Sequence, residues 1–243
     1  MESIMIIKKD KKYAVLTGDI VKSSKLSINQ HNLVLNELKN IIQKLPQMHT
    51  PLAKEKIQWI GPSIFQGDTW QVLTNLPEYA LLTAFYVKAC LIYQRSALTR
   101  ISIGIGTVDH LPEDNLSQAR GDAFTYSGHG LSLLKDSEHM ACWFVPPIKQ
   151  PIRKKIGNAD YHNLFLNTSL SFAGRITEEW SKLEAFAVKC TIHGLKQNVI
   201  ALQWPENTTT QQNVGDTLSR AKWIEIEKVL NLYQKFISEK QAI

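Results

Sequence analysis

Hydrophobic and polar residues follow two different periods along the first 145 residues. Short apolar or alternating runs, typical of β-strands, occur at 13–17, 57–60, 69–73, 100–108 and 140–145. Between them, apolar residues at helical spacing predict helices that follow Ser27, open at Pro77 and begin near Gly121. The Pro77 helix is expected to be amphipathic and to reach about Ala97. This mixture predicts an α+β fold, a sheet with helices packed on one face.

The pattern changes after residue 145. Prolines and a basic run between residues 146 and 155 interrupt the periodicity, as linkers do. From Asp160 onward only helical periods appear. One capped helix is predicted to start at Thr177–Trp180 and a longer one to cover Trp223–Glu239. The sequence therefore predicts an α+β domain over residues 1–148, a linker over 149–159 and an all-α domain over 160–243.

Composition narrows the class of protein only slightly. The 243 residues, 44% hydrophobic and 21% charged, are enough for a substantial core. An excess of 28 Lys and Arg over 22 Asp and Glu weakly favours nucleic acid or phosphate partners. Cys90, Cys142 and Cys190 lack metal-ligand spacing and are expected to be buried, reduced thiols of a cytoplasmic protein. No apolar stretch has the length of a membrane span, so no membrane partner is expected.

Two Gly-Asp pairs carry the clearest candidate chemistry. Asp19 and Asp68 each stand beside a predicted strand, and pairing of the two strands would bring both carboxylates to one rim of the sheet. Oxygen ligands of this kind suit Mg²⁺, and a cation would relieve the repulsion between them. Gly-Asp is also common in turns. A magnesium site and a pair of turn aspartates are therefore both open.

The last third of the chain contains a candidate helix-turn-helix. A short helix over 195–202 and a second over 208–220 flank a break at 203–207. Their apolar residues are predicted to pack together, as the two helices of that motif must: Val199, Ile200 and Leu202 under Val214 and Leu218.

The second of these helices offers side chains suited to DNA. The candidate base-reading residues are Thr209, Thr210, Gln211, Gln212 and Asn213, and the candidate phosphate contacts are Arg220 and Lys222. Gly215 lowers the propensity of this helix by about 1 kcal/mol. The alternative is a helical packing module, or one that pairs with a second copy of the chain, whose polar face is only solvated.

Several segments together resemble the SatD family of bacterial proteins. They are Ala14–Ser24, Phe65–Asp68, Arg100–Gly106, Ala119–Phe124 and Leu218–Trp223. The resemblance extends over nearly the whole chain, and its motifs are moderately specific. Members of this family are often described as regulators. The resemblance implies an α+β domain followed by a helix-turn-helix, and adds architecture more than activity.

The first domain is also similar to the palm of class III nucleotidyl cyclases, a ferredoxin-like βαββαβ sheet. This resemblance implies a metal site made by the carboxylates of Asp19 and Asp68 and the backbone carbonyl of Ile20. It also implies a phosphate-binding turn at Lys22, Ser23 and Ser24, where backbone N–H groups at a helix start would face the ligand. The ligand would be a nucleotide.

The chain departs from the cyclase pattern at three positions. Ile64 stands near the position of the base-reading Lys, Thr125 replaces an Asn and His129 replaces the Arg that stabilises the transition state. Losing such a partner lowers rates by orders of magnitude. Thr125 and His129 are therefore expected to contact a ligand without supporting cyclisation.

Three functions follow from these residues. The leading hypothesis is a cytoplasmic transcriptional regulator whose palm binds a nucleotide or another phosphate ligand and whose helix-turn-helix contacts DNA. The alternatives are a magnesium-dependent nucleotidyl cyclase or transferase, and a non-catalytic interaction scaffold. His110, Glu113 and Asp114 form a weaker candidate metal site in a loop.

Overall fold

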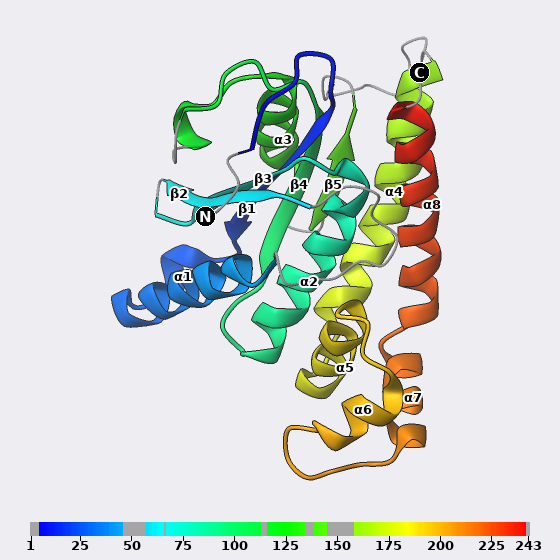
Figure 1. Cartoon of the computed structure of the whole chain (residues 1–243). Helices are drawn as coiled ribbons and strands as arrows, with labels where there is room; N and C mark the ends of the chain where they lie inside the picture. Colours follow the sequence, from blue (N-terminus) through cyan, green and yellow to red (C-terminus); the bar gives the residue numbers. More distant parts are fainter. Residues whose placement is uncertain are drawn as a thin grey trace.

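In the computed structural model, residues 5–45, 57–65, 67–112, 116–134, 139–144 and 158–241 are described. Within them, five strands form one sheet of order β2-β3-β1-β4-β5 (Figure 1). Strand β1 pairs antiparallel with β3 and β4, β2 pairs antiparallel with β3, and β4 pairs parallel with β5. The strands are β1 (Tyr13–Ile20), β2 (Trp59–Phe65), β3 (Thr69–Thr74), β4 (Thr99–Gly106) and β5 (Met140–Trp143).

The α-helices of the described residues alternate with the strands at first and then follow one another. They are α1 (Ile28–Gln43), α2 (Ala80–Tyr93), α3 (Asp122–Leu133), α4 (Asn158–Glu178), α5 (Lys182–Ile192), α6 (Gln197–Leu202), α7 (Gln211–Arg220) and α8 (Trp223–Gln241). The predicted α+β class is confirmed. The prediction that only helices follow residue 160 also holds for the described residues. None of these helices has the length and apolar character of a membrane-spanning segment.

Helices cover both faces of the sheet, so the predicted one-sided cover is wrong. Side chains alternate between the faces along β1. Ala14 and Leu16 belong to the core shared with α1 and α2, whereas Tyr13 and Val15 pack with Phe124 of α3. Helix α3 can lie close to β4 because Gly104 and Gly106 present no side chain to it. Helix α3 therefore covers the second face of the sheet, and it can do so because β4 has glycines where the two elements meet.

Helix α2 is buried almost all round instead of being amphipathic. It lies between the sheet and two helices, α1 and α5, so it has little surface left for solvent. A short 3₁₀ turn at Pro77–Tyr79 precedes it, and it ends at Tyr93, before the expected Ala97. Its one Lys, Lys88, is buried with the apolar residues.

The helical part shares its core with the sheet part. Leu170 of α4, Val188 of α5 and Tyr233 of α8 belong to the same apolar cluster as Phe85 of α2. The Tyr233 hydroxyl donates a hydrogen bond to the Pro77 carbonyl at 2.7 Å. Most of the predicted linker, residues 149–157, lies outside the described residues, and the domain boundary stays a prediction.

The predicted start of one helix, α5, is wrong by four residues. Thr177 lies inside the last turns of α4, and the capped start is Ser181, whose side chain and that of Glu184 form a capping box for α5. Both segments have a hydroxyl residue followed within three positions by Glu, but only Ser181 has it at the third position, as a capping box requires.

Candidate functional site

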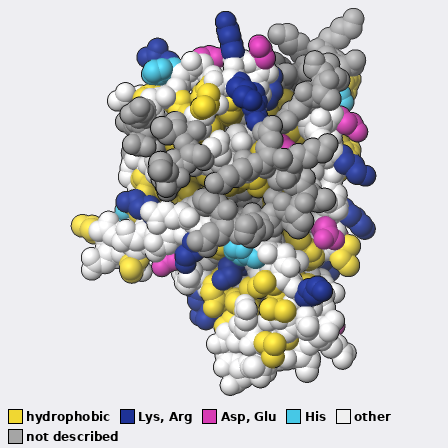
Figure 2. Space-filling view, in the orientation of Figure 1, with side chains coloured by type: hydrophobic (Ala, Val, Ile, Leu, Met, Phe, Trp, Pro, Cys, Tyr) yellow, Lys and Arg dark blue, Asp and Glu magenta, His cyan; other side chains and the backbone are white. Residues whose placement is uncertain are grey.

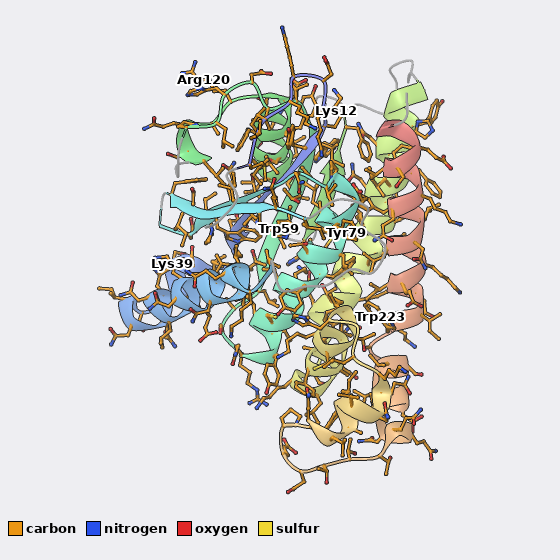
Figure 3. The ribbon with its side chains drawn as sticks, in the orientation of Figure 1. Lys12, Lys39, Trp59, Tyr79, Arg120 and Trp223 are labelled. Carbon is orange, nitrogen blue, oxygen red and sulfur yellow. The ribbon has the colours of Figure 1, made fainter. Side chains whose placement is uncertain are left out.

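The strand register brings Asp19 and Asp68 to the same edge of the sheet. Asp19 on β1 lies opposite Thr69 on β3, and Asp68 directly precedes that residue in the β2–β3 turn. Figure 3 labels Lys12, which precedes β1 at the far end, and Lys39 on α1, which lies near the end where Asp19 stands. We call this end of β1, with the turns that adjoin it, the β1 edge.

The Asp19 carboxylate forms a two-pronged ion pair with Arg100. The two residues are register partners on β1 and β4. The Arg100 Nε donates to Asp19 Oδ1 at 2.9 Å, and Nη2 donates to Oδ2. A third group, Nη1, donates to the Leu134 carbonyl at 3.4 Å. With 17% and 24% of their side chains exposed, the pair is largely withdrawn from solvent. It is therefore a stronger and more specific contact than an exposed salt bridge.

The Asp68 carboxylate is held by the turn that follows β1. The Ser23 hydroxyl donates a hydrogen bond to Asp68 Oδ2 at 2.5 Å. Lys22 adopts a left-handed backbone conformation, φ 58°, and starts the 3₁₀ turn Ser23–Lys25. Lys22, Ser24 and Lys25 are exposed. The predicted phosphate turn thus lies beside both aspartates and presents two ammonium groups to solvent.

Both carboxylates have protein partners in this arrangement: Asp19 pairs with Arg100, and Asp68 accepts from Ser23. No cluster of three or more His, Cys, Asp or Glu within the described residues could hold a metal. A cation shared by Asp19 and Asp68 would have to replace Arg100 on one side and Ser23 on the other. Next to these side chains, the Thr99 hydroxyl donates to the Asp19 backbone carbonyl at 2.7 Å. A metal held by Asp19, Ile20 and Asp68 stays a prediction, and it would require Arg100 to leave Asp19.

Three buried polar side chains, Trp70, Lys88 and Thr99, form hydrogen bonds next to the β1 edge. The Trp70 Nε1 donates to the Thr99 hydroxyl at 3.1 Å, and the Lys88 ammonium donates to the Thr99 carbonyl at 2.8 Å. Burial lowers the pKa of Lys88 to about 8, although the carboxylate of Glu178 acts in the opposite direction. Thr99 thereby links helix α2 to the backbone of Asp19.

Sequence reasoning missed these supporting residues. Arg100 was noted only as the start of a strand, and its pairing with Asp19 depends on the register between β1 and β4. One signal could have suggested this ion pair: a cation begins one strand and an anion ends another, so antiparallel pairing of the strands can bring them together. Lys88 lies in an apolar run, and no sequence feature reports its burial.

The structure does not bring Thr125 and His129 to the β1 edge. Ser127, which lies between them on α3, faces the sheet, and its hydroxyl is 2.8 Å from that of Thr17. Residues two positions away lie about 200° round the helix, and both Thr125 and His129 are exposed. Their side chains therefore point away from the sheet, on the outer side of α3.

The predicted second helix of the DNA-binding pair begins three residues later than expected, at Gln211. Thr210 is its N-cap, and its hydroxyl accepts a hydrogen bond from the Asn213 N–H at 3.1 Å. The Asn213 side chain donates to the Thr209 hydroxyl at 2.8 Å. Asn213 is thus partly engaged in the cap, while Gln211 and Gln212 are exposed.

Helix α7 packs on α5 and α6 through Val214 and Leu218. Ile200 of α6 is buried beneath it, as predicted, but Leu202 is 71% exposed and does not take part in this core. Helix α6 is only a turn and a half long, so its buried positions are Ile200 and Ala201. The packing of the two helices therefore rests on fewer apolar residues than the sequence suggested.

The two predicted phosphate contacts differ in their surroundings. Arg220 donates to the Thr217 hydroxyl at 2.9 Å and lies 3.6 Å from the Glu184 carboxylate, yet most of its side chain is exposed. Lys222 is exposed in the left-handed turn, φ 57°, between α7 and α8. Trp223, which opens α8, marks this junction in Figure 3.

Helices α6 and α7 form one tip of the molecule, far from β2 (Figure 1). In Figure 2 this tip is mostly uncharged on the visible face, with few acidic side chains. Of the weaker loop site, only His110 is described, and its backbone pairs with that of Arg120; Glu113 and Asp114 lie outside the described residues.

Comparison of the chain with protein-family models, with curated proteins and with solved structures gives no match.

Proposed function

We propose that this chain is a regulatory protein in which a phosphate-bearing ligand at the β1 edge alters the contact of α7 with duplex DNA. The observation that carries the proposal is the placement of α7. Its first turn directs Gln211 and Gln212 to solvent at the tip, while Val214 and Leu218 anchor it to α5 and α6. A polar helix start supported from behind is the arrangement with which a recognition helix enters a major groove.

The ligand half of the proposal is supported by topology and by charge. The order β1-α1-β2-β3-α2-β4, with β1 between β3 and β4, agrees with a ferredoxin-like palm. At the β1 edge, Lys22 and Lys25 are exposed, Asp19 is paired with Arg100, and Asp68 accepts a hydrogen bond from Ser23. Ammonium groups and the Ser24 hydroxyl are suitable partners for phosphate oxygens. A nucleoside triphosphate is the ligand class that we propose.

A contact path joins the two halves. Lys88 ties α2 to Thr99 and so to the backbone of Asp19. Helix α2 packs on α5, and α5 packs on α7. A ligand that moves the Asp19–Arg100 pair would also move Thr99, and through Lys88 it would act on α2. Such a path supports coupling only if both sites change the same equilibrium.

Charge predicts a modest affinity for DNA. Residues 160–243 contain nine Lys and Arg and nine Asp and Glu, so the net positive charge of the chain lies outside its helical part. Binding through α7 would therefore depend on few phosphate contacts and more on base-edge contacts from the glutamines.

Magnesium at the β1 edge stays a prediction, since a cation would first have to displace Arg100 from Asp19. The alternative of a nucleotidyl cyclase or transferase has less support. The residues that replace the catalytic Asn and Arg of that family, Thr125 and His129, lie on the exposed side of α3.

The DNA half is tested by fluorescence anisotropy with a pool of random duplexes in 50 mM salt. We expect measurable binding that the double variant Gln211→Ala/Gln212→Ala weakens at least tenfold. Two exposed polar residues on α1, Asn32 and Asn36, provide the matched control when both are changed to Ala. Equal affinity of the two double variants would reject α7 as the DNA-contacting helix.

A further inference from the structure

The outward face of α4 departs from what a solvent-exposed helix normally presents. Positions 161, 165, 168, 172 and 175 follow the spacing of four and three residues that lines one side of a helix. They hold Tyr161, Phe165, Thr168, Phe172 and Arg175, which we call the α4 stripe. No Asp, Glu, Lys or Arg occurs between residues 161 and 174. A helix surface in water usually carries charged residues on this side.

The α4 stripe is exposed because α4 packs inward with its other side. Leu166, Leu170 and Ala173 are buried against β5, α2 and α8. Tyr161, Phe165 and Phe172 expose 56%, 67% and 70% of their surfaces. At about 200 Å² for each aromatic side chain, these three rings alone present about 400 Å².

Helix α8 extends the exposed apolar surface. The Phe236 ring lies 5.3 Å from that of His162 on α4, so this side of α8 faces α4. Leu232 lies one turn earlier on the same side of α8 and is also exposed. Figure 1 shows α4 and α8 side by side along one edge of the molecule. Together with Leu164 and Leu232, each a little over half exposed, the three rings present about 600 Å², compared with the roughly 800 Å² per partner of a standard interface.

We propose that the α4 stripe is a homodimer interface, in which the α4 helices of two copies pack antiparallel about a twofold axis near Thr168. A twofold axis places each surface against itself. Phe165 of one copy then lies opposite Phe172 of the other, on both sides of the axis. The spacing of the stripe is nearly the same in both directions from Thr168, as such pairing requires.

The ends of the stripe are complementary as well. Tyr161 and Arg175 are each seven residues from Thr168, so the twofold axis places the Tyr161 ring of one copy beside the Arg175 guanidinium of the other. A guanidinium over an aromatic face is an attractive pair. Among the described residues, Arg175 makes a long ion-pair contact of 3.8 Å with Glu178, and 59% of its side chain is exposed. A different, uncharged partner protein would not supply the Tyr161–Arg175 pairs that two copies of this chain form.

The proposal is tested with the full chain by light scattering coupled to gel filtration, from 1 to 100 µM. We expect a dimer that the double variant Phe165→Glu/Phe172→Glu converts to a monomer, raising the dimer dissociation constant at least 100-fold. Both rings are exposed, so the thermal unfolding midpoint of the separated monomer is expected to stay within a few degrees. A wild-type chain that is monomeric at 100 µM would overturn the proposal, as would a double variant that stays dimeric.

Cross-linking tests the position of the axis independently. Thr168→Cys brings two thiols together at the axis, and the three native cysteines are buried. We expect Thr168→Cys to form a covalent dimer under mild oxidation at least tenfold faster than Ser219→Cys, an exposed control on α7. Equal rates for the two variants would show that the copies do not meet at Thr168 and would overturn the antiparallel arrangement.

Discussion

At the scale of single residues, the β1 edge is organised by charged groups that have partners inside the fold. Asp19 is paired with Arg100, and Asp68 accepts a hydrogen bond from Ser23. Lys88, just below, is buried with the Thr99 carbonyl as its acceptor. Each of these groups would be costly to bury alone, so each makes a separate prediction about stability.

Lys88 predicts a specific dependence of stability on pH. Its pKa is about 8 in the folded chain, against 10.5 for a lysine in water. The unfolded chain therefore binds more protons between these values, and the contribution of Lys88 to the free energy of unfolding rises with pH across that window. The penalty is fully present below pH 8 and corresponds to about 3 kcal/mol.

Replacing Lys88 with Met removes the charge and keeps the side-chain length. We expect Lys88→Met to gain stability relative to the wild type at pH 7 and to lose that advantage as pH approaches 10. Urea unfolding of both proteins at several pH values gives the difference, in which the titrating thiols common to both cancel. A difference that does not change between pH 7 and 10 would contradict the account.

The two aspartates are expected to differ in their contribution to stability. Asp19→Asn leaves the partly buried Arg100 without its counter-charge, and we expect a loss of about 1–3 kcal/mol. Asp68→Asn keeps an oxygen that accepts from Ser23, so it is the matched control with a loss below about 1 kcal/mol. Denaturant unfolding at pH 7 measures both. Equal losses would show that Arg100 does not depend on Asp19.

At the scale of elements, the contact between α3 and β4 depends on a glycine in the strand, Gly104. A Cβ at Gly104 would lie 2.2 Å from the Ala123 carbonyl oxygen and 2.4 Å from the Ser127 nitrogen. Both are backbone atoms of α3 and cannot rotate away. The sheet can carry a helix on this face only while position 104 is Gly.

Two glycine substitutions test this contact. We expect Gly104→Ala to destabilise the fold by about 3 kcal/mol or more, because the helix must move. Gly128→Ala, on α3 itself, meets open space and is expected to stabilise the helix by about 0.5–1 kcal/mol. Thermal unfolding monitored by circular dichroism compares them. A tolerated Gly104→Ala would mean that α3 does not rest on β4.

An element can be predicted from the sequence when residues close to it in the chain stabilise it, and not when distant residues do. The strands β1, β3 and β4 were predictable because their hydrophobic pattern is local. The capping box at Ser181 and the start of α7 at Gln211 were misplaced, because neighbouring hydroxyl residues offer alternative caps and packing chooses among them. The Asp19–Arg100 pair joins residues 81 positions apart. No local pattern reports such a contact, whereas the motif search did find Asp19 and Asp68.

At the scale of the whole molecule, the proposed DNA contact depends on few charges. The helical part has no net charge, and Arg220 and Lys222 are its predicted phosphate contacts. With two to three neutralised phosphates, the logarithm of the binding constant is expected to fall with the logarithm of salt with a slope of about −2 to −3. Anisotropy titrations from 50 to 200 mM salt measure the slope, and a value near −6 would show that a different, basic surface binds DNA.

The central claim is that the β1 edge and α7 act on one equilibrium. Its most direct test is the affinity of the full chain for duplex DNA in 50 mM salt, measured with and without 1 mM ATP or GTP. We expect binding that at least one nucleotide changes fivefold or more, an effect lost in Lys22→Ala/Lys25→Ala, because linked sites must influence each other. Undetectable DNA binding at this salt, or an affinity unchanged by saturating nucleotide, would contradict the account.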